Sequence, residues 1–167
     1  MKKTTIYFAK TKSEATIPSK RKEDAGYDIY ACFKEDNVII QPHETKMIPT
    51  GLASSFESGY VFILKERGST GSKGIGQRCG IIDSGYRNEW FVPITNHNDK
   101  PIVITKETNE NTLNILKADY IVYPYTKAIT QAILFELPDT EVKELSYDEL
   151  LQIKSERGMG KLGSSGK

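Results

Sequence analysis

The stretch Gly59-Tyr-Val-Phe-Ile-Leu-Lys-Glu66 decides the fold class, because it places β-branched and aromatic side chains in one short run. A segment rich in glycine and hydroxyl side chains follows it directly. A run of this length beside turn residues is typical of a β-strand. Similar runs recur along the chain: TTIYFAK, NVIIQP, TKMIPTGLA, WFVPITN, KPIVITK, NTLNILK, YIVYPY, AITQAILFEL and EVKEL. Many short strands with turns between them predict an all-β fold, a sandwich or barrel of antiparallel sheets.

One helical signal stands out, and it lies near the C-terminus. Ser146-Tyr-Asp-Glu149 has the spacing of a capping box, in which the two end side chains bond free backbone N–H groups of the first turn. Leu150, Leu151 and Ile153 follow as apolar positions. The sequence therefore predicts at most one short helix.

Length and charge limit the number of domains and the kinds of partner. The chain has 167 residues, so we expect a single domain over 1–167. Lys and Arg number 23 against 22 Asp and Glu, a net charge of +1, which creates no overall field toward nucleic acid or a membrane surface. The sequence contains no run of ~18 apolar residues, so it predicts no membrane-spanning helix.

The first residues and the cysteines indicate the compartment. The opening MKKTTIYFAK has two lysines but lacks the apolar stretch of a secretory signal. Cys32 and Cys79 match no zinc-binding spacing and are too few for a disulfide framework. We therefore expect a cytoplasmic protein with reduced thiols.

Two glycine-rich segments have the composition of anion-binding loops. Residues 65–74 and the tail 157–167 combine basic side chains with hydroxyls and with backbone N–H groups that glycine leaves accessible. The spacing of the first is not that of a Walker A loop. The alternatives are an ordinary turn between strands for 65–74 and a frayed terminus for the tail.

A single carboxylate, Asp83, lies between an apolar run and a turn in Gly80–Tyr86. One interpretation is an aspartate that orients and deprotonates a water molecule beside a bound ligand. The alternative is a turn aspartate that bonds its own backbone. Asp24 and Asp28 lie on either side of Gly26, and a solvated turn is the simplest interpretation of this second acidic segment.

Together, five segments resemble the motifs of the trimeric dUTPase family, in the family's order. They are AGYDIYA at 25–31, RGSTGSKG at 67–74, GIIDSGY at 80–86, AITQAIL at 128–134 and RGMGKLGSSG at 157–166. The chain looks like a Gram-positive or phage member, and the resemblance leaves out chiefly the stretch from about 98 to 126. It implies a homotrimer of jelly-roll-like β subunits. Each of three active sites would draw motifs from all three chains, with the flexible glycine-rich C-terminal arm closing as a lid.

The resemblance also implies the reaction, which is Mg²⁺-dependent hydrolysis of dUTP to dUMP and pyrophosphate and limits uracil incorporation into DNA. Asp83 matches the carboxylate that activates the attacking water, and Gln131 matches the glutamine that helps to place it. Tyr86 matches the ring that packs on the deoxyribose and leaves no room for a 2′-hydroxyl. Asp28 matches the acid that holds the water shell of the metal.

Further residues match substrate contacts of the family. Arg67 and Arg157 match its phosphate-binding arginines. Residues 77–82 would form a hairpin whose backbone reads the uracil edge. The remaining substrate-binding positions are Gly68, Ser69, Gly80, Ile82, Leu162, Gly163 and Ser164.

The chain departs from the family pattern at three positions. Gly68 replaces a serine aimed at the phosphate bridge, and Ser69 or Thr70 would have to substitute for it. Ala128 replaces an arginine, which removes a structural charge. Leu162 replaces the lid phenylalanine, which forfeits ring stacking of about 1 kcal/mol.

Residues 97–126 are longer than the simple connection of compact members and predict an extra hairpin or small sheet. This insertion is either decorative or a surface for a protein regulator. Two other functions therefore stay open beside dUTP hydrolysis. One is dCTP deamination on the same fold, which needs a catalytic glutamate in a different strand context. The other is a dUTP-sensing regulator that binds a partner through the insertion.

Overall fold

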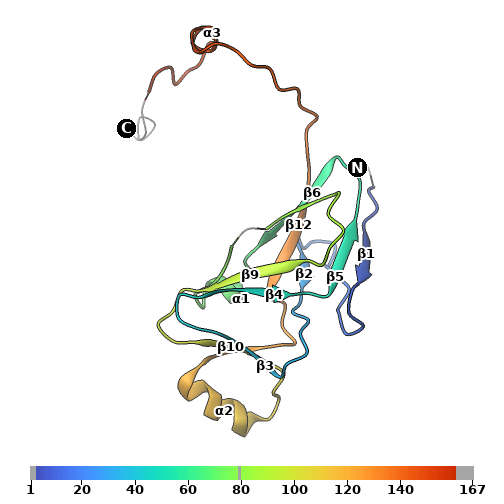
Figure 1. Cartoon of the computed structure of the whole chain (residues 1–167), viewed down its shortest axis with the longest axis vertical. Coiled ribbons are helices and arrows are strands. Elements are labelled where there is room, and N and C mark those ends of the chain that lie inside the picture. Colours follow the sequence, from blue (N-terminus) through green and yellow to red (C-terminus); the bar gives the residue numbers. More distant parts are fainter. Residues whose placement is uncertain (1–2, 79, 161–167) are drawn as a thin grey trace.

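Strands dominate the computed structural model, which describes residues 3–78 and 80–160 (Figure 1). The strands are β1 (Tyr7–Lys10), β2 (Tyr27–Ile29), β3 (Asn37–Ile40), β4 (Thr45–Pro49), β5 (Leu52–Ser55), β6 (Tyr60–Lys65), β7 (Ile75–Gln77), β8 (Ile81–Asp83), β9 (Phe91–Asn96), β10 (Ile102–Thr105), β11 (Ile121–Pro124) and β12 (Thr130–Glu136). The helices are α1 (Gly68–Gly71), α2 (Glu110–Asp119) and α3 (Tyr147–Gln152). None of them combines the length and apolar character needed to cross a membrane, as far as the described residues extend.

The strands form small sheets that pack on one another. Their orders are β2-β12-β6-β8, β4-β9-β7, β11-β10-β3 and β1-β5. Every pairing is antiparallel except that of β10 with β11. The predicted dominance of β-strands is therefore confirmed, whereas the prediction of purely antiparallel sheets is wrong at β10 and β11.

An aromatic cluster fills the space between the sheets. Trp90 and Phe62 are fully buried, and their ring centroids lie 5.4 Å apart in an edge-to-face arrangement. Phe8 from the edge strand β1 stacks edge-on against Trp90 at 5.5 Å. Burial of each such ring contributes roughly 1.5–3 kcal/mol. This core fixes β6 and β12, the strands that carry the polar site described below.

The prediction of at most one short helix is wrong, because the described residues contain three. The predicted helix exists as α3, and its capping box forms as expected. The Glu149 carboxylate accepts from the backbone N–H of Ser146 at 2.9 Å, and the Ser146 hydroxyl accepts from the N–H of Glu149 at 3.3 Å. The helix α1 is a single turn within the glycine-rich segment that follows β6.

The insertion 97–126 is not a hairpin, because α2 connects β10 to a parallel β11. The alternative of a small sheet is confirmed, since β10 and β11 form a three-stranded sheet with β3. The run NTLNILK, interpreted as a strand, is part of α2. The side chain of Asn109 caps this helix by accepting from the N–H groups of Asn111 at 3.0 Å and Thr112 at 3.3 Å. Leu113 and Leu116 are half-buried at helical spacing. The cap residue was the signal that the strand interpretation overlooked.

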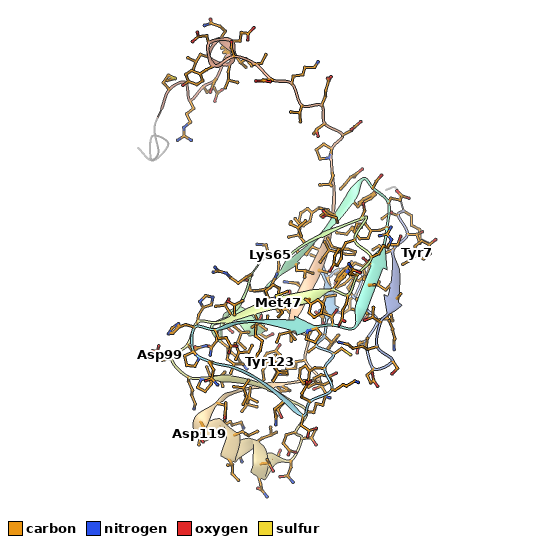
Figure 2. All side chains as sticks on the ribbon, in the orientation of Figure 1. Tyr7, Met47, Lys65, Asp99, Asp119 and Tyr123 are labelled. Atoms are coloured by element: carbon orange, nitrogen blue, oxygen red, sulfur yellow. The ribbon has the colours of Figure 1, made fainter. Side chains whose placement is uncertain are left out.

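The chain after β12 leaves the body of the molecule (Figure 1). Every residue from 137 to 160 is exposed, and Figure 2 shows their side chains standing apart from the packed strands. The predicted strand EVKEL is absent, since an extended segment without a partner forms no ladder. The expected lid glycines beyond 160 lie outside the described residues.

Candidate active site

Three strands and the loop after β6 bring polar groups from three of the five motifs together. Gln131 on β12 is paired in register with Asp28 on β2 and with Lys65 on β6. Arg67 lies two residues beyond Lys65, at the start of the α1 turn. A pocket of about 640 Å³ opens here, lined by Ser19, Lys20, Arg21, Glu23, Asp24, Ala25, Gly26, Asp28, Arg67 and Gln131.

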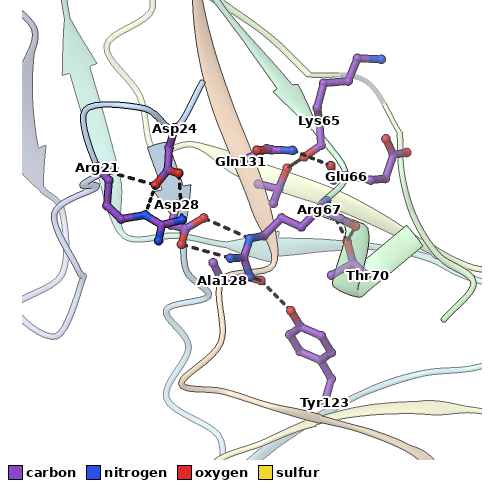
Figure 3. Close-up of polar contacts among 11 residues, drawn as sticks. Arg21, Asp24, Asp28, Lys65, Glu66, Arg67, Thr70, Tyr123, Ala128 and Gln131 are labelled. Atoms are coloured by element: carbon purple, nitrogen blue, oxygen red, sulfur yellow. Dashed lines mark hydrogen bonds and ion pairs between the residues drawn. The ribbon is translucent and has the colours of Figure 1, made fainter. Parts of the chain in front are cut away.

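Asp28 and Arg67, which both line this pocket, form a two-point ion pair (Figure 3). The guanidinium donates from Nε to Oδ1 at 3.0 Å and from Nη2 to Oδ2 at 3.2 Å. The two side chains are 35% and 30% exposed, so the pair is partly screened by solvent and still reachable by a ligand. Two parallel N–H donors fix the plane of the guanidinium.

Gln131 is held at its amide end. Its Nε2 donates to the backbone carbonyl of Glu66 at 2.9 Å. The absence of a side chain at Gly26 makes room for it, since a Cβ there would lie 3.0 Å from Gln131 Oε1. The Glu66 carboxylate in turn accepts from the N–H of Gln77 at 3.1 Å. The amide thus has a fixed direction, with its oxygen at the pocket.

The rim of the pocket carries a second two-point ion pair, between Arg21 and Asp24. The two bonds measure 2.9 Å from Nε and 3.0 Å from Nη2. The hydrogen bond from the Arg21 side chain lowers the pKa of the Asp24 carboxyl, and a bond from the Arg21 backbone N–H adds to this effect. The same pair raises the pKa of Arg21. Both groups therefore stay charged throughout the neutral range.

The residues predicted from the third motif form a separate group on β8. Asp83 is exposed, and no described residue forms a hydrogen bond or ion pair with its carboxylate. The Tyr86 ring is 38% exposed, and its hydroxyl donates to the carbonyl of Glu89 at 3.1 Å. The side chain of Ile82 is buried in the core, and the residue is paired with Phe62 on β6. Because β8 is the last strand of its sheet, half of its backbone groups lie on an open edge.

The two groups do not meet within one chain. Asp83 is opposite Val61 at one end of β6, whereas Gln131 is opposite Lys65 at the other. Four residues of strand correspond to about 13 Å. The structure therefore brings together Asp28, Arg67 and Gln131, and it leaves Asp83 and the β8 edge apart from them.

The predicted hairpin over 77–82 is wrong in its pairing. The strands β7 and β8 on either side of this segment belong to different sheets, since β7 pairs with β9 and β8 with β6. Gly80 is needed at the bend, where φ is +137° and a Cβ would meet the Leu64 carbonyl oxygen at 2.8 Å. The segment is a crossover between sheets, and residue 79 lies outside the described part of the chain.

The other predicted contacts are at the edge of the site or away from it. Gly68 and Ser69 are exposed in α1 beside Arg67. Arg157 is exposed on the C-terminal segment, where its Nε donates to the carbonyl of Gly160 at 3.2 Å. The remaining lid positions, Leu162, Gly163 and Ser164, lie outside the described residues.

Two residues that contact the site were missed in the sequence. Glu66 anchors Gln131 through its backbone, and the pairing of β6 with β12 was the signal that could have found it. Tyr123 reaches the site from β11, inside the insertion, and donates to the carbonyl of Ala128 at 2.6 Å (Figure 3). No motif marks Tyr123, because its contact depends on tertiary packing.

Comparison with known proteins identifies the family of this chain. The dUTPase family model matches residues 12–109. The chain belongs to the dUTPase family. It is 35% identical to the deoxyuridine 5′-triphosphate nucleotidohydrolase of Nautilia profundicola, over 97% of this chain and 99% of that protein. The Helicobacter hepaticus enzyme of the same name is 32% identical over 98% of this chain and 91% of its own length.

A solved dUTPase structure extends the likeness to the fold. A mutant of the Staphylococcus bacteriophage 80alpha dUTPase, solved with dUpNHpp, has a TM-score of 0.74 and 26% identity, covering 98% of this chain and 99% of that one. The structure named native EIAV dUTPase has a TM-score of 0.63 at 21% identity, covering 86% of this chain and 98% of that one, a likeness that concerns the fold alone. Membership of the dUTPase family therefore extends to the part of the chain beyond the family-model match.

Proposed function

We propose that this chain hydrolyses dUTP to dUMP and pyrophosphate and so limits the incorporation of uracil into DNA. The observation that carries the proposal is the meeting of Asp28, Arg67 and Gln131 in one pocket, from three separate motifs, in a member of the dUTPase family. Two nucleotidohydrolase relatives that match nearly the whole chain support the same activity.

The charges that line the pocket show that binding of a triphosphate needs further positive charge. Three cationic and three acidic side chains line it, so its own charges balance. A nucleoside triphosphate brings about four negative charges, and their stabilisation is the main task of an enzyme that cleaves a phosphoanhydride. Arg67 supplies a two-point donor to phosphate oxygens. The remaining positive charge would come from Mg²⁺ and from Arg157.

The residues present fit Mg²⁺ held through the substrate. This ion takes one or two carboxylates, phosphate oxygens and waters, rather than a protein cage. In the described residues no group of three or more His, Cys, Asp and Glu could enclose a metal. Asp28 uses one lone pair of each oxygen toward Arg67 and keeps others for metal-bound waters. When bound, the ion would polarise the triphosphate and neutralise part of its charge.

In this proposal a second copy of the chain completes the site. Asp83 would approach the α-phosphate from a neighbouring subunit and take a proton from the attacking water, while Gln131 orients that water. The exposed Asp83 carboxylate, which has no partner among the residues that the structure describes, and its separation from Gln131 support a shared site. We propose a homotrimer of single-domain, jelly-roll-like subunits in the cytoplasm. The arm beyond 156 would cover the nucleotide with Arg157, Leu162, Gly163 and Ser164, beside Gly68 and Ser69.

The β8 edge would read the base and the sugar. The Gly80 carbonyl accepts from the N–H of Leu64 on β6 at 2.7 Å. The groups that would pair with the polar edge of uracil are therefore those backbone groups of β8 that face away from β6. A rigid backbone next to C5 would reject thymine by a clash with its methyl group. The Tyr86 ring, packed on the deoxyribose, would exclude a ribonucleotide.

A substrate comparison tests the proposal. Purified protein is incubated with Mg²⁺ and with dUTP, dTTP, dCTP or UTP in turn, and pyrophosphate release is measured. We expect release from dUTP far above that from the other three. Formation of a uridine nucleotide from dCTP would indicate a deaminase instead, and tight dUTP binding without turnover would indicate a regulator. Either outcome would overturn the proposal.

A further inference from the structure

We infer that Tyr123 is a positioning residue that sets the orientation of Arg67 toward the phosphates. The inference rests on the proposed function, in which Arg67 binds the triphosphate. Tyr123 belongs to none of the five motifs and comes from β11, inside the insertion. Its contacts connect that insertion to the lining of the pocket.

Tyr123 and Arg67 share one acceptor. The Tyr123 hydroxyl donates to the backbone carbonyl of Ala128 at 2.6 Å, and Arg67 Nη1 reaches the same oxygen at 3.5 Å (Figure 3). The short bond from Tyr123 takes one lone pair of the carbonyl oxygen and competes with Arg67, whose own bond to that oxygen is long. The guanidinium instead keeps its two bonds to Asp28. The hydroxyl thereby limits how far the arginine turns away from the pocket.

Tyr123 is itself held firmly. It is 2% exposed, and the register of β10 with β11 places it opposite Ile104. Figure 2 shows it inside the packed body of the molecule. Burial raises the pKa of Tyr123, while contacts with Ser69 and Arg67 act in the opposite direction. The hydroxyl therefore stays protonated, as a donor, at every pH at which the enzyme would work.

Tyr123 also touches the turn that carries the phosphate-binding residues. Its contact with Ser69 reaches α1, and Lys73 Nζ lies over its ring at 6.0 Å from the centroid. One buried side chain thus contacts Arg67, the α1 turn and the residue that leads into β12. Loss of its hydroxyl would free the Ala128 carbonyl to draw Arg67 toward it.

The test compares Tyr123→Phe with Tyr125→Phe in the full-length protein. Tyr125 is a matched control on the same segment, because its ring packs on Phe33 at 4.9 Å, on the side of Cys32. We expect Tyr123→Phe to raise KM for dUTP about three- to tenfold, the effect of one hydrogen bond. Its kcat should stay within about a factor of two, because the lost interaction stabilises bound substrate and transition state equally. Tyr125→Phe should leave both constants unchanged.

The binding of a ligand without phosphate distinguishes a loss of Arg67 positioning from a general loosening of the site. Tyr123→Phe should weaken binding of dUpNHpp and leave that of deoxyuridine unchanged, as measured by calorimetry. Equal losses for both ligands, or a fall in kcat without a change in KM, would overturn the inference. In an Arg67→Lys background, Tyr123→Phe should add little, and a full additional loss there would also contradict it.

A measurement on the unaltered protein covers the case in which Tyr123→Phe does not fold. The Cζ resonance of Tyr123 should shift when dUpNHpp binds and stay in place when deoxyuridine binds, and no shift with dUpNHpp would overturn the inference. Turnover of dUTP by the unaltered protein tests the proposed function separately. A protein that turns over dUTP but shows no such effects at Tyr123 retains the function and loses only this inference.

Discussion

Asp28 and Arg67 are joined by two hydrogen bonds across a strand to which neither belongs. Asp28 is on β2, Arg67 follows β6, and β12 lies between these strands with Gln131 at the same level. The bonds measure 3.0 and 3.2 Å. A carboxylate, an amide and a guanidinium are thereby aligned on one side of the sheet. This alignment requires the β12 register, because a slip by one residue would turn Gln131 to the other face.

Asp28→Asn should change the metal dependence of the enzyme more than its stability. The asparagine keeps one acceptor for Arg67 but loses the charge that attracts Mg²⁺ and its waters. A partly exposed ion pair of this kind contributes about 1 kcal/mol or less. We expect the Mg²⁺ concentration for half-maximal rate to rise about tenfold or more, with little change in melting temperature. The control is Asp24→Asn on the rim of the same pocket, and equal Mg²⁺ dependence in both variants would remove Asp28 from the metal.

Asp83→Asn should stop turnover and spare binding. A positioned general base contributes about 10²- to 10⁴-fold, so we expect a fall in kcat of that order. The carboxylate has no partner among the described residues, so its replacement should not disturb the fold. Single-turnover rates and the affinity for dUpNHpp measure the two effects. A near-normal kcat would exclude Asp83 as the base.

Mixed oligomers test whether the site is shared. Asp83→Asn and Arg67→Gln should each inactivate a homotrimer, because every site would lack one group. When equal amounts are unfolded and refolded together, mixed trimers acquire sites with Asp83 from one chain and Arg67 from another. In cyclic threefold symmetry about a quarter of all sites become complete. Recovered activity near that fraction is expected, and none at all would contradict a shared site.

The resemblance to the dUTPase motifs singled out Asp28, Arg67 and Gln131, and the structure brings these three side chains into one pocket. Residue type alone was not enough, because it favoured a solvated turn at Asp28. Local patterns also predicted β6, β12 and the capped α3 correctly. The helix α2 was missed because the Leu and Ile residues of NTLNILK suit a strand as well as a helix. The Asn109 cap in front of this run is the feature that distinguishes the two. The role of Tyr123 depends on a parallel pairing that no local pattern encodes.

Removal of the Arg21 side chain should raise the pKa of Asp24 toward its ordinary value of 3.8. Because the pKa of Asp24 is lowered in the folded protein, the ion pair stabilises the fold at pH values above 3.8. This contribution disappears as the pH falls through the folded pKa of Asp24. The Arg21 backbone N–H bond remains at 3.1 Å, so we expect Arg21→Gln to reverse the shift only in part. Carboxyl ¹³C titration by NMR measures it. Lys22→Gln, an adjacent exposed cation, is the control, and an equal effect there would contradict a specific pair.

Gly80→Ala should damage both stability and base discrimination. At φ +137° a new Cβ would lie 2.8 Å from the Leu64 carbonyl oxygen and 2.7 Å from Gln77 Nε2. The Leu64 carbonyl oxygen cannot move away easily, because the backbone of Leu64 is held by its N–H bond to the carbonyl of Gly80 at 2.7 Å. Strain of this kind costs about 1–3 kcal/mol. Thermal unfolding at a fixed protein concentration measures it, because the stability of an oligomer depends on concentration.

Gly59→Ala is the matched control for this substitution, because no atom lies within 4 Å of a Cβ at that position. Relief of the strain at Gly80 would move the β8 edge, which we propose reads uracil. We therefore expect the ratio of kcat/KM for dUTP over dTTP to fall in Gly80→Ala and to stay constant in Gly59→Ala. If Gly80→Ala were as stable and as selective as Gly59→Ala, the bend at Gly80 would constrain neither the fold nor the recognition of the base.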